Sequence, residues 1–203
     1  MKLTTSIGPN PGLVTLFVAE KGLTIETETL DIVKGANRTP AFAARNPLAQ
    51  TPVLELDSGM QLSESVAICE YLEELHPAPP LIGTTPEERA ETRMWVRRID
   101  LGTVQPMVAG FRGAEGLPMF KDRMRCVPEG ADGMKAVARD GLAMLDAQLA
   151  GREFVVGDRL TLADLLLFAF VEFGARVGQP VDAALQNLGA WRARMAARPS
   201  AAA

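Results

Sequence analysis

Glu64 and Ser65 are the residues of this sequence whose types and spacing point most directly to ligand binding. The pattern places them in the first turn of a helix, where unpaired backbone N–H groups and the positive end of the helix dipole favour a carboxylate. Glu64 is also an acid that could hold an ammonium group. Upstream, the backbone of Thr51 could pair with an extended peptide, as an added strand pairs with an open sheet edge. These features predict a small peptide-like ligand with an α-amino and an α-carboxylate group, although an acid and a serine are also ordinary first-turn residues.

A short strand and a helix are predicted to position these residues. The strand begins directly after Pro52 and is closed by the turn residues 57–59. The helix is predicted to follow almost at once, with Ser63 as its N-cap. Its apolar face is predicted to contain Ala67, Ile68, Tyr71, Leu72 and Leu75. Because proline cannot donate a hydrogen bond to a sheet, its place at the mouth of a strand favours a cis Thr51–Pro52 bond.

The segments 46–56 (NPLAQTPVLEL) and 62–72 (LSESVAICEYL) resemble the glutathione-binding half of the cytosolic glutathione transferases. The resemblance implies that the backbone of Thr51 pairs with the cysteinyl part of glutathione and that Glu64 and Ser65 hold its γ-glutamyl end. The implied glutathione-binding residues are Gln50, Thr51, Pro52, Val53, Glu64, Ser65 and Arg38. Arg38 is expected at the glycyl carboxylate, and Lys34 and Asn37 are the alternatives for that role.

The N-terminal part of the chain alternates between predicted strands and helices. Strands are predicted at 2–7, 25–32 and 53–56, and helices are predicted from Leu13 to Lys21, from Arg38 to Arg45 and after Ser63. The residues 8–12 (GPNPG) are predicted to form a loop, because glycine and proline interrupt regular structure. A strand–helix–strand crossover predicts a parallel strand pair. The order of elements resembles the thioredoxin-like fold.

The group that would activate the glutathione thiol is sought in the loop after the first strand, where the thioredoxin-like fold keeps its reactive group. Several transferase classes place a serine or threonine where this chain has Gly8, and its only tyrosine, Tyr71, lies elsewhere. Where the beta class carries a cysteine and the nu class an asparagine, this chain has Asn10, so the resemblance makes Asn10 the catalytic candidate. Its side-chain N–H, the loop amides and the helix dipole could stabilise a thiolate, since a hydrogen bond to a charged group contributes about 1.5–3 kcal/mol. Ser6 and Thr5 are the alternatives, and Asn10 could instead be a simple Asn-Pro turn residue.

The composition of the 203-residue chain argues against several classes of partner. The net charge is −4 and the pI is near 5.2, which argues against nucleic acid because phosphate binding needs clustered Lys and Arg. The longest apolar run, 165–171, is far shorter than the roughly 20 residues of a membrane span. Cys69 and Cys126 are far apart and His76 is the single histidine, so no metal site and no redox dithiol are expected, and the expected location is the cytoplasm.

The chain beyond His76 is predicted to be helical. A helix is expected to start at Thr85 and to kink near Pro106, and a Thr161–Asp164 capping box is expected to open a very apolar helix. A further helix is predicted to bury most of one face, which contains Met134, Val137, Ala138, Gly141, Leu142, Leu145 and Leu149.

These elements predict two domains, 1–76 and 85–203, joined by a proline-rich linker at 77–84. The fold class is therefore an α/β thioredoxin-like N-terminal domain followed by an all-α C-terminal domain, the architecture of the glutathione transferases.

The resemblance implies that glutathione is a co-substrate whose thiolate attacks a small hydrophobic electrophile, a detoxification reaction, and that the active form is a homodimer. The apolar candidates for an electrophile pocket are Trp95, Val104, Met107, Val108 and Phe111, and packing is the alternative role for each. Two other functions stay open: a non-catalytic binding or scaffold protein of this fold, and a glutathione-dependent isomerase, dehalogenase or disulfide-bond reductase.

Overall fold

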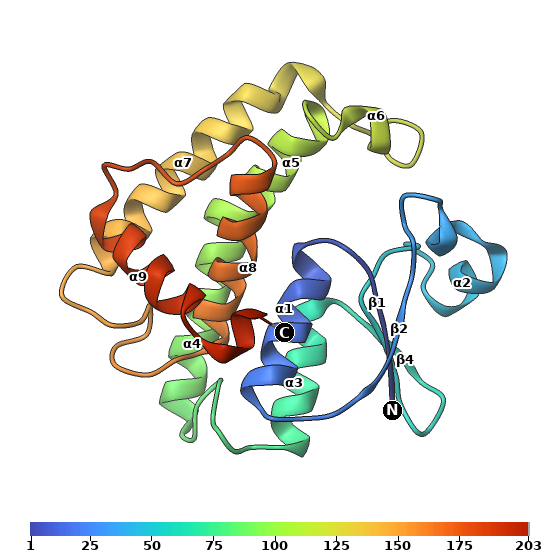
Figure 1. Cartoon of the computed structure of the whole chain (residues 1–203), viewed down its shortest axis with the longest axis horizontal. Coiled ribbons are helices and arrows are strands. Elements are labelled where there is room, and N and C mark those ends of the chain that lie inside the picture. The colour runs from blue at the N-terminus through green and yellow to red at the C-terminus, as the bar shows by residue number, and fades with distance from the viewer. Residues whose placement is uncertain (203) are drawn as a thin grey trace. The chain divides into compact units, whose positions relative to one another are not determined.

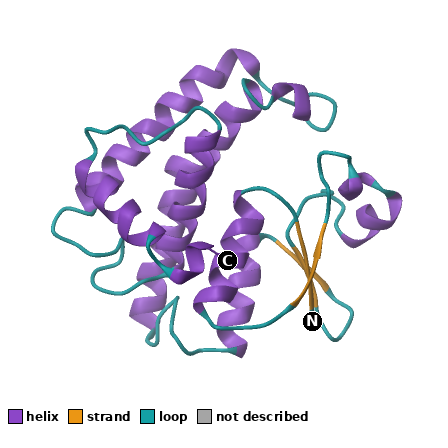
Figure 2. Ribbon diagram, in the orientation of Figure 1, coloured by secondary structure: helices purple, strands orange, loops and turns teal. Residues whose placement is uncertain are grey.

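A four-stranded mixed sheet lies at the centre of the N-terminal part of the chain (Figure 2). Across the sheet the strands follow the order β2 (Glu26–Thr29), β1 (Lys2–Thr5), β3 (Val53–Glu55) and β4 (Gln61–Ser63). β1 is parallel to β2 and antiparallel to β3, and β3 and β4 form an antiparallel hairpin. The computed structural model describes residues 1–202, which form two compact units, Met1–Leu81 with Ala202 and Ile82–Ala201.

Helices cover both faces of this sheet (Figure 1). α1 (Pro9–Glu20) and α3 (Ser65–Leu75) lie together on one face, and α2 (Pro40–Arg45), preceded by the 3-10 turn η1 (Ala36–Arg38), lies on the other. Successive strand residues point to opposite faces. Thr4 faces α2, so its neighbour Leu3 faces the apolar core under α1 and α3. The fully buried members of this core include Leu13, Phe17, Leu54, Ile68 and Leu72. The predicted thioredoxin-like α/β fold is confirmed.

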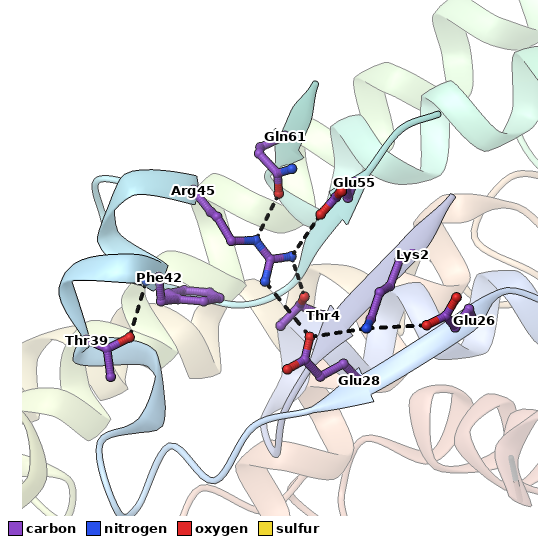
Figure 3. Close-up of polar contacts among 9 residues, drawn as sticks. All are labelled: Lys2, Thr4, Glu26, Glu28, Thr39, Phe42, Arg45, Glu55 and Gln61. Atoms are coloured by element: carbon purple, nitrogen blue, oxygen red, sulfur yellow. Dashed lines mark hydrogen bonds and ion pairs between the residues drawn. The ribbon is translucent and has the colours of Figure 1, made fainter. Parts of the chain in front are cut away.

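Arg45, the last residue of α2, contacts a side chain from every strand of the sheet (Figure 3). Its guanidinium donates to Thr4 Oγ1 (2.8 Å) and to Gln61 Oε1 (3.1 Å). It also lies 3.7 Å from Glu55 and 3.9 Å from Glu28. Because one planar group can donate five hydrogen bonds, a single arginine anchors the short α2 to the whole sheet.

The predicted loop at residues 8–12 is wrong, because α1 begins at Pro9 rather than at Leu13. Proline is tolerated in the first turn of a helix, where its missing N–H would have had no helical partner. Gly8 supplies the sharp entry with a φ of +131°. Asn10 therefore belongs to the first turn of α1 and not to a loop before it.

The predicted N-cap at Ser63 is also wrong, because Ser63 ends the strand β4, which the sequence analysis missed. α3 starts at Ser65, and Glu64 occupies the N-cap position with no side-chain cap. The turn predicted at 57–59 is confirmed as the turn between β3 and β4.

A buried ion pair joins the C-terminal ends of α1 and α3. The side chains of Lys21 and Glu73 are 0% and 1% exposed and contact each other directly. Lys21 Nζ also donates to the carbonyl oxygens of His76 (2.7 Å) and Pro79 (2.6 Å), and Glu73 accepts the Leu81 N–H (3.3 Å). Buried charges persist only when they are paired and hydrogen-bonded, and this pair meets that condition.

The second unit, Ile82–Ala201, is helical, as predicted. Its helices are α4 (Pro86–Ile99), α5 (Gln105–Gly113), α6 (Leu117–Phe120), α7 (Ala131–Gln148), α8 (Leu162–Arg176) and α9 (Gln186–Ala196). Its shorter turns are η2 (Asp100–Val104), η3 (Pro128–Gly130) and η4 (Pro199–Ala202). Thr85 and Glu88 form a capping box at the start of α4, and the π-helical η2 interrupts the helix just before Pro106, where a kink was expected.

α8 is buried along most of its length, and the predicted Thr161–Asp164 capping box is confirmed. Asp164 accepts hydrogen bonds from the Thr161 N–H and hydroxyl (both 3.0 Å), from the Val155 N–H (2.9 Å) and from Trp191 Nε1 (3.0 Å). Burial raises the pKa of this carboxyl group, and these donors oppose the rise. Asp164 thus joins the start of α8 to α9.

The buried face of α7 is narrower than predicted. Ala138, Gly141, Leu142, Leu145 and Leu149 are buried. Met134 and Val137 are 40% and 44% exposed, so their assignment to the core is wrong. At Gly141 a Cβ would lie 2.4 Å from Gly102 O, which shows how closely α7 approaches η2. This close contact buries one side of α7 and leaves the adjacent side exposed.

Candidate functional site

The register of the β3–β4 hairpin brings the two predicted binding segments to the same end of the sheet. Val53 pairs with Ser63. Thr51 and Pro52 directly precede Val53, and Glu64 and Ser65 directly follow Ser63, so the two segments lie side by side. Thirteen positions of sequence separate Thr51 from Glu64, and the hairpin removes that separation in space.

The backbone of Thr51 is available to a ligand. The Thr51–Pro52 bond is cis, as predicted. Within residues 1–202 neither the N–H nor the C=O of Thr51 has a hydrogen-bond partner. The preceding loop is held by two asparagine side chains: Asn46 Nδ2 donates to Gln50 O (2.9 Å), and Asn37 Nδ2 donates to Ala49 O (2.5 Å). A rigid loop with an unpaired backbone amide at its end is suited to bind an extended peptide.

Glu64 has an unusual backbone conformation, with a φ of +70°. The first hydrogen bond of α3 runs from the Ile68 N–H to Glu64 O (3.0 Å), so the N–H groups of the three residues before Ile68 point out of the helix end. Ser65 is buried, whereas the side chain of Glu64 is exposed. The arrangement offers backbone donors for a carboxylate and an acid for an ammonium group at neighbouring positions.

Asn10 lies next to this helix end. The Ser65 hydroxyl donates to Asn10 Oδ1 (3.0 Å), which leaves the amide Nδ2 of Asn10 as its donor. Pro9 and Pro11 have no N–H group, and the Gly12 N–H is bonded to Gly8 O (3.1 Å). The Asn10 backbone N–H is therefore the one donor that the first three residues of α1 can offer.

Ser6, the alternative catalytic residue, is already engaged. Its Oγ lies 2.5 Å from Thr51 Oγ1 and 3.1 Å from Ile7 O. A hydroxyl has one proton to donate, so Ser6 must give up one of these contacts to bond a thiolate.

The three residues considered for the glycyl carboxylate lie in η1 or just before it. Lys34 Nζ forms an exposed pair with Asp31 (3.3 Å), and the Asn37 amide nitrogen is bound to Ala49 O. Arg38 ends η1 with an exposed side chain.

The predicted pocket residues of the helical unit form two groups. Trp95, Val104 and Met107 are 7%, 3% and 1% exposed. Val108 and Phe111 are half-buried, and the ring of Phe111 contacts other aromatic rings edge to face. Within residues 1–202 no three His, Cys, Asp or Glu side chains gather as metal ligands. No helix in that described part is both long enough and apolar enough to cross a membrane.

Comparison with known proteins establishes the family. The model of the glutathione S-transferase N-terminal domain matches residues 1–74, and that of the C-terminal domain matches residues 130–199. The chain belongs to the glutathione S-transferase family.

Individual relatives agree with this assignment. The chain is 32% identical over 200 residues to glutathione S-transferase 2 of Saccharomyces cerevisiae, a match that covers 97% of this chain and 85% of that protein. A crystal structure of a glutathione S-transferase domain-containing protein from Marinobacter aquaeolei VT8 superposes with a TM-score of 0.92 at 38% identity, covering 98% of this chain and 99% of that one. A maleylacetoacetate isomerase of Pseudomonas aeruginosa is 28% identical over 172 residues, covering 84% of this chain and 79% of that protein.

Sequence reasoning missed the strand that completes the site and the two asparagines that hold its loop. The alternation of Gln61, Leu62 and Ser63 after a turn is the local pattern that could have indicated β4. Asn37 and Asn46 carry no comparable pattern, because their partners are carbonyl groups several residues away.

Proposed function

We propose that this protein is a glutathione transferase that activates the thiol of bound glutathione for attack on a hydrophobic electrophile. The observation that carries the proposal is the hairpin register, which sets the unpaired backbone of Thr51 beside the open N-terminus of α3. The family provides the ligand that matches this arrangement of groups.

In this proposal glutathione lies extended along the end of the sheet. Its cysteinyl amide groups pair with the Thr51 backbone, its γ-glutamyl carboxylate accepts from the backbone N–H of Ser65, and its ammonium group pairs with Glu64. Gln50 and Val53 flank this segment. The exposed guanidinium of Arg38 binds the glycyl carboxylate, because an arginine can hold a carboxylate through two hydrogen bonds.

Asn10 is the proposed donor to the thiolate. Ser65 orients its amide through Oδ1, so Nδ2 and the backbone N–H remain to face the sulfur. A free thiol has a pKa near 8.5, and lowering it by about 2 units requires about 2.7 kcal/mol of preferential thiolate stabilisation. Two donors at the positive end of a helix supply energy of that order.

The chemical step forms one bond between the glutathione sulfur and an electrophilic carbon. In a displacement the leaving group departs with its electron pair, and in an addition the electron pair of the double bond moves to the neighbouring carbon, which water protonates. The protein forms no covalent bond and acts by lowering the thiol pKa and by orientation. We assign glutathione binding to residues 1–76 and the electrophile pocket to residues 85–203, with the half-buried Val108 and Phe111 and the buried Trp95, Val104 and Met107 as its candidate residues.

The first test is calorimetric titration of reduced glutathione into the parent protein and into the Glu64→Ala, Ser65→Ala double variant. We expect saturable binding by the parent and its loss in the double variant, because Glu64→Ala removes the ammonium partner and Ser65→Ala removes the hydroxyl that holds Asn10 at the helix end. Glu74→Ala is the matched control, since it removes the same charge from an exposed position of the same helix. If millimolar glutathione does not bind to the parent, the proposal fails.

The isomerase relative favours a second candidate, glutathione-dependent isomerisation. There the thiolate adds to a double bond and is later expelled, so glutathione is regenerated. Measuring free thiol during turnover separates the two reactions, since a transferase consumes one glutathione per product and an isomerase consumes none. A chain that binds glutathione but turns over neither type of substrate would be the non-catalytic binding protein.

We also propose that the active form is a cytoplasmic homodimer. The helical unit exposes large apolar side chains along α4 with η2 and along α7, namely Met94, Leu101, Met134, Val137 and Met144. α7 and α4 both pack against η2, and exposed apolar patches on a globular protein commonly mark an interface.

A further inference from the structure

Arg112, in the last turn of α5, is a partly buried cation without an acidic partner. Its Nε is buried and has no hydrogen-bond partner, and within residues 1–202 no carboxylate lies in ion-pair range of its guanidinium. Burial lowers the pKa of this group, and a Coulombic interaction with Cys126 partly opposes the decrease. Buried charges in proteins are normally paired, so an unpaired one calls for a partner.

The surroundings of Arg112 are aromatic. Its guanidinium lies 5.3 Å from the centroid of the Phe120 ring, and Arg123 lies 5.8 Å from the same centroid. Phe120 meets Phe111 edge to face at 5.9 Å, and Phe111 meets Phe173 at 5.1 Å. Arg112 therefore borders an aromatic cluster centred on Phe111, one of the residues proposed to line the electrophile pocket.

The local charge is positive, although the chain as a whole carries −4. The segment 112–125 contains the cations Arg112, Lys121, Arg123 and Arg125 and the acids Glu115 and Asp122. The nearest of these acids in sequence, Glu115, is bound to Lys135 at 2.5 Å. Glu129, Asp132 and Asp140, which lie on the segments η3 and α7 packed against α5, form no ion pair with Arg112.

We propose that Arg112 binds the carboxylate of the electrophilic substrate, so that the preferred electrophiles are small aromatic or conjugated acids. The guanidinium presents a planar pair of N–H donors that fits a carboxylate, and the adjoining rings of Phe111 and Phe120 fit a planar apolar body. This inference rests on the proposed transferase function and names its substrate class.

A matched pair of electrophiles tests the inference: 4-chloro-3-nitrobenzoate and its methyl ester. In both, the glutathione sulfur bonds to the ring carbon that bears chlorine, and chloride leaves with the electron pair. Each kcat/KM is divided by the uncatalysed rate constant, because the carboxylate and the ester activate the ring differently. The parent should have the higher corrected kcat/KM for the acid. Arg112→Met should lower the corrected kcat/KM at least ten-fold more for the acid than for the ester, mainly by raising the KM for the acid.

Two further variants separate recognition from folding. Arg112→Lys keeps the charge and should recover part of the preference for the acid. Arg123→Met removes the other cation from the Phe120 ring and should change the acid and ester values by the same factor. If Arg112→Met lowers the acid value and the ester value by the same factor, Arg112 only stabilises the helical unit and the inference is overturned.

Binding without turnover distinguishes failure of the inference from failure of the proposed function. Calorimetric titration of unreactive 3-nitrobenzoate and its methyl ester is carried out on the full chain with glutathione present. Tighter binding of the acid that is lost in Arg112→Met supports the inference even if neither chlorinated compound is conjugated. Conjugation of the ester with no preference for the acid in either assay leaves the transferase proposal standing and removes the role of Arg112.

Discussion

Glu64 carries an acidic side chain at a position whose backbone conformation favours glycine. Its φ of +70° is a conformation that glycine adopts freely and that costs other residues about 1–3 kcal/mol. Glycine would relieve this strain but would remove the carboxylate. That an acid stands at this strained position, with its side chain exposed, supports a binding role for Glu64 rather than a packing role.

Asn10 is a residue whose role depends on its amide orientation. The Ser65 hydroxyl holds Oδ1, so the opposite side of the amide carries the donor. We expect Asn10→Ala to raise the pKa of the bound glutathione thiol by about 1 unit, because it removes a hydrogen bond to a charged group worth about 1.5 kcal/mol. At a pH below the thiol pKa of the parent complex, the conjugation rate of Asn10→Ala should be about ten-fold lower than that of the parent.

The measurement is the ultraviolet absorbance of the bound thiolate as a function of pH, with Ser6→Ala titrated in parallel. The two variants decide between the candidates. A raised pKa in Ser6→Ala together with an unchanged pKa in Asn10→Ala would assign thiol activation to Ser6.

At the scale of elements, two devices hold the helices of the α/β unit in place. Arg45 anchors α2 to all four strands (Figure 3), and the Lys21–Glu73 pair joins the ends of α1 and α3. The site is built on the opposite ends of α1 and α3, where Asn10 and Ser65 meet. Tilting either helix would separate these side chains, so the buried pair helps to keep Asn10 and Ser65 in contact.

Lys21→Met should destabilise the protein by about 3–5 kcal/mol, because it leaves the carboxylate of Glu73 buried without a counter-charge. The Lys21→Met, Glu73→Leu double variant should recover most of this loss, since an apolar pair of similar volume can replace a buried ion pair. Recovery should be incomplete, because the carbonyl groups of His76 and Pro79 lose their donor.

Urea denaturation followed by circular dichroism measures these changes. Lys34→Met is the control, because its ion pair with Asp31 is exposed and exposed pairs contribute little. Equal stability of Lys21→Met and the parent would show that the buried pair is not needed.

At the scale of the whole molecule, α4 with η2 and α7 expose large apolar side chains. Two of those on α7 were predicted to be part of the core. Met134 and Val137 have the periodicity of a core face but are exposed in the single chain. Apolar periodicity does not distinguish a face buried within one chain from a face buried between two chains, because both remove the same surface from water.

The Leu101→Glu, Val137→Glu double variant should shift the protein from dimer to monomer in sedimentation equilibrium. A charge placed in an apolar interface must be desolvated without a partner, which opposes association. Val33→Glu is the control, since Val33 is 66% exposed in the other unit and lies outside this surface. A parent that sediments as a monomer would refute the dimer proposal.

The sequence alone was enough to predict the fold class, the family and the cis Thr51–Pro52 bond, and it located the two candidate binding segments. The fold class follows from apolar periodicity and turn residues, the cis bond from a proline at the mouth of a strand, and the family from the resemblance of segments 46–56 and 62–72 to the glutathione transferases. The Thr85 and Thr161 capping boxes were also predictable, because each involves residues only three positions apart.

Only the tertiary structure decided which groups meet. Partners distant in sequence determine the strand β4, the Asn10–Ser65 contact and the unpaired state of Arg112. The start of α1 at Pro9 was missed because proline usually interrupts a helix but is tolerated in its first turn. Local propensity reflects the structural preference of a short segment. Which groups form hydrogen bonds and which are buried is determined only when distant segments pack together. For that reason the candidate glutathione-binding residues could be listed from the sequence, but their geometry and the unpaired charge of Arg112 could not.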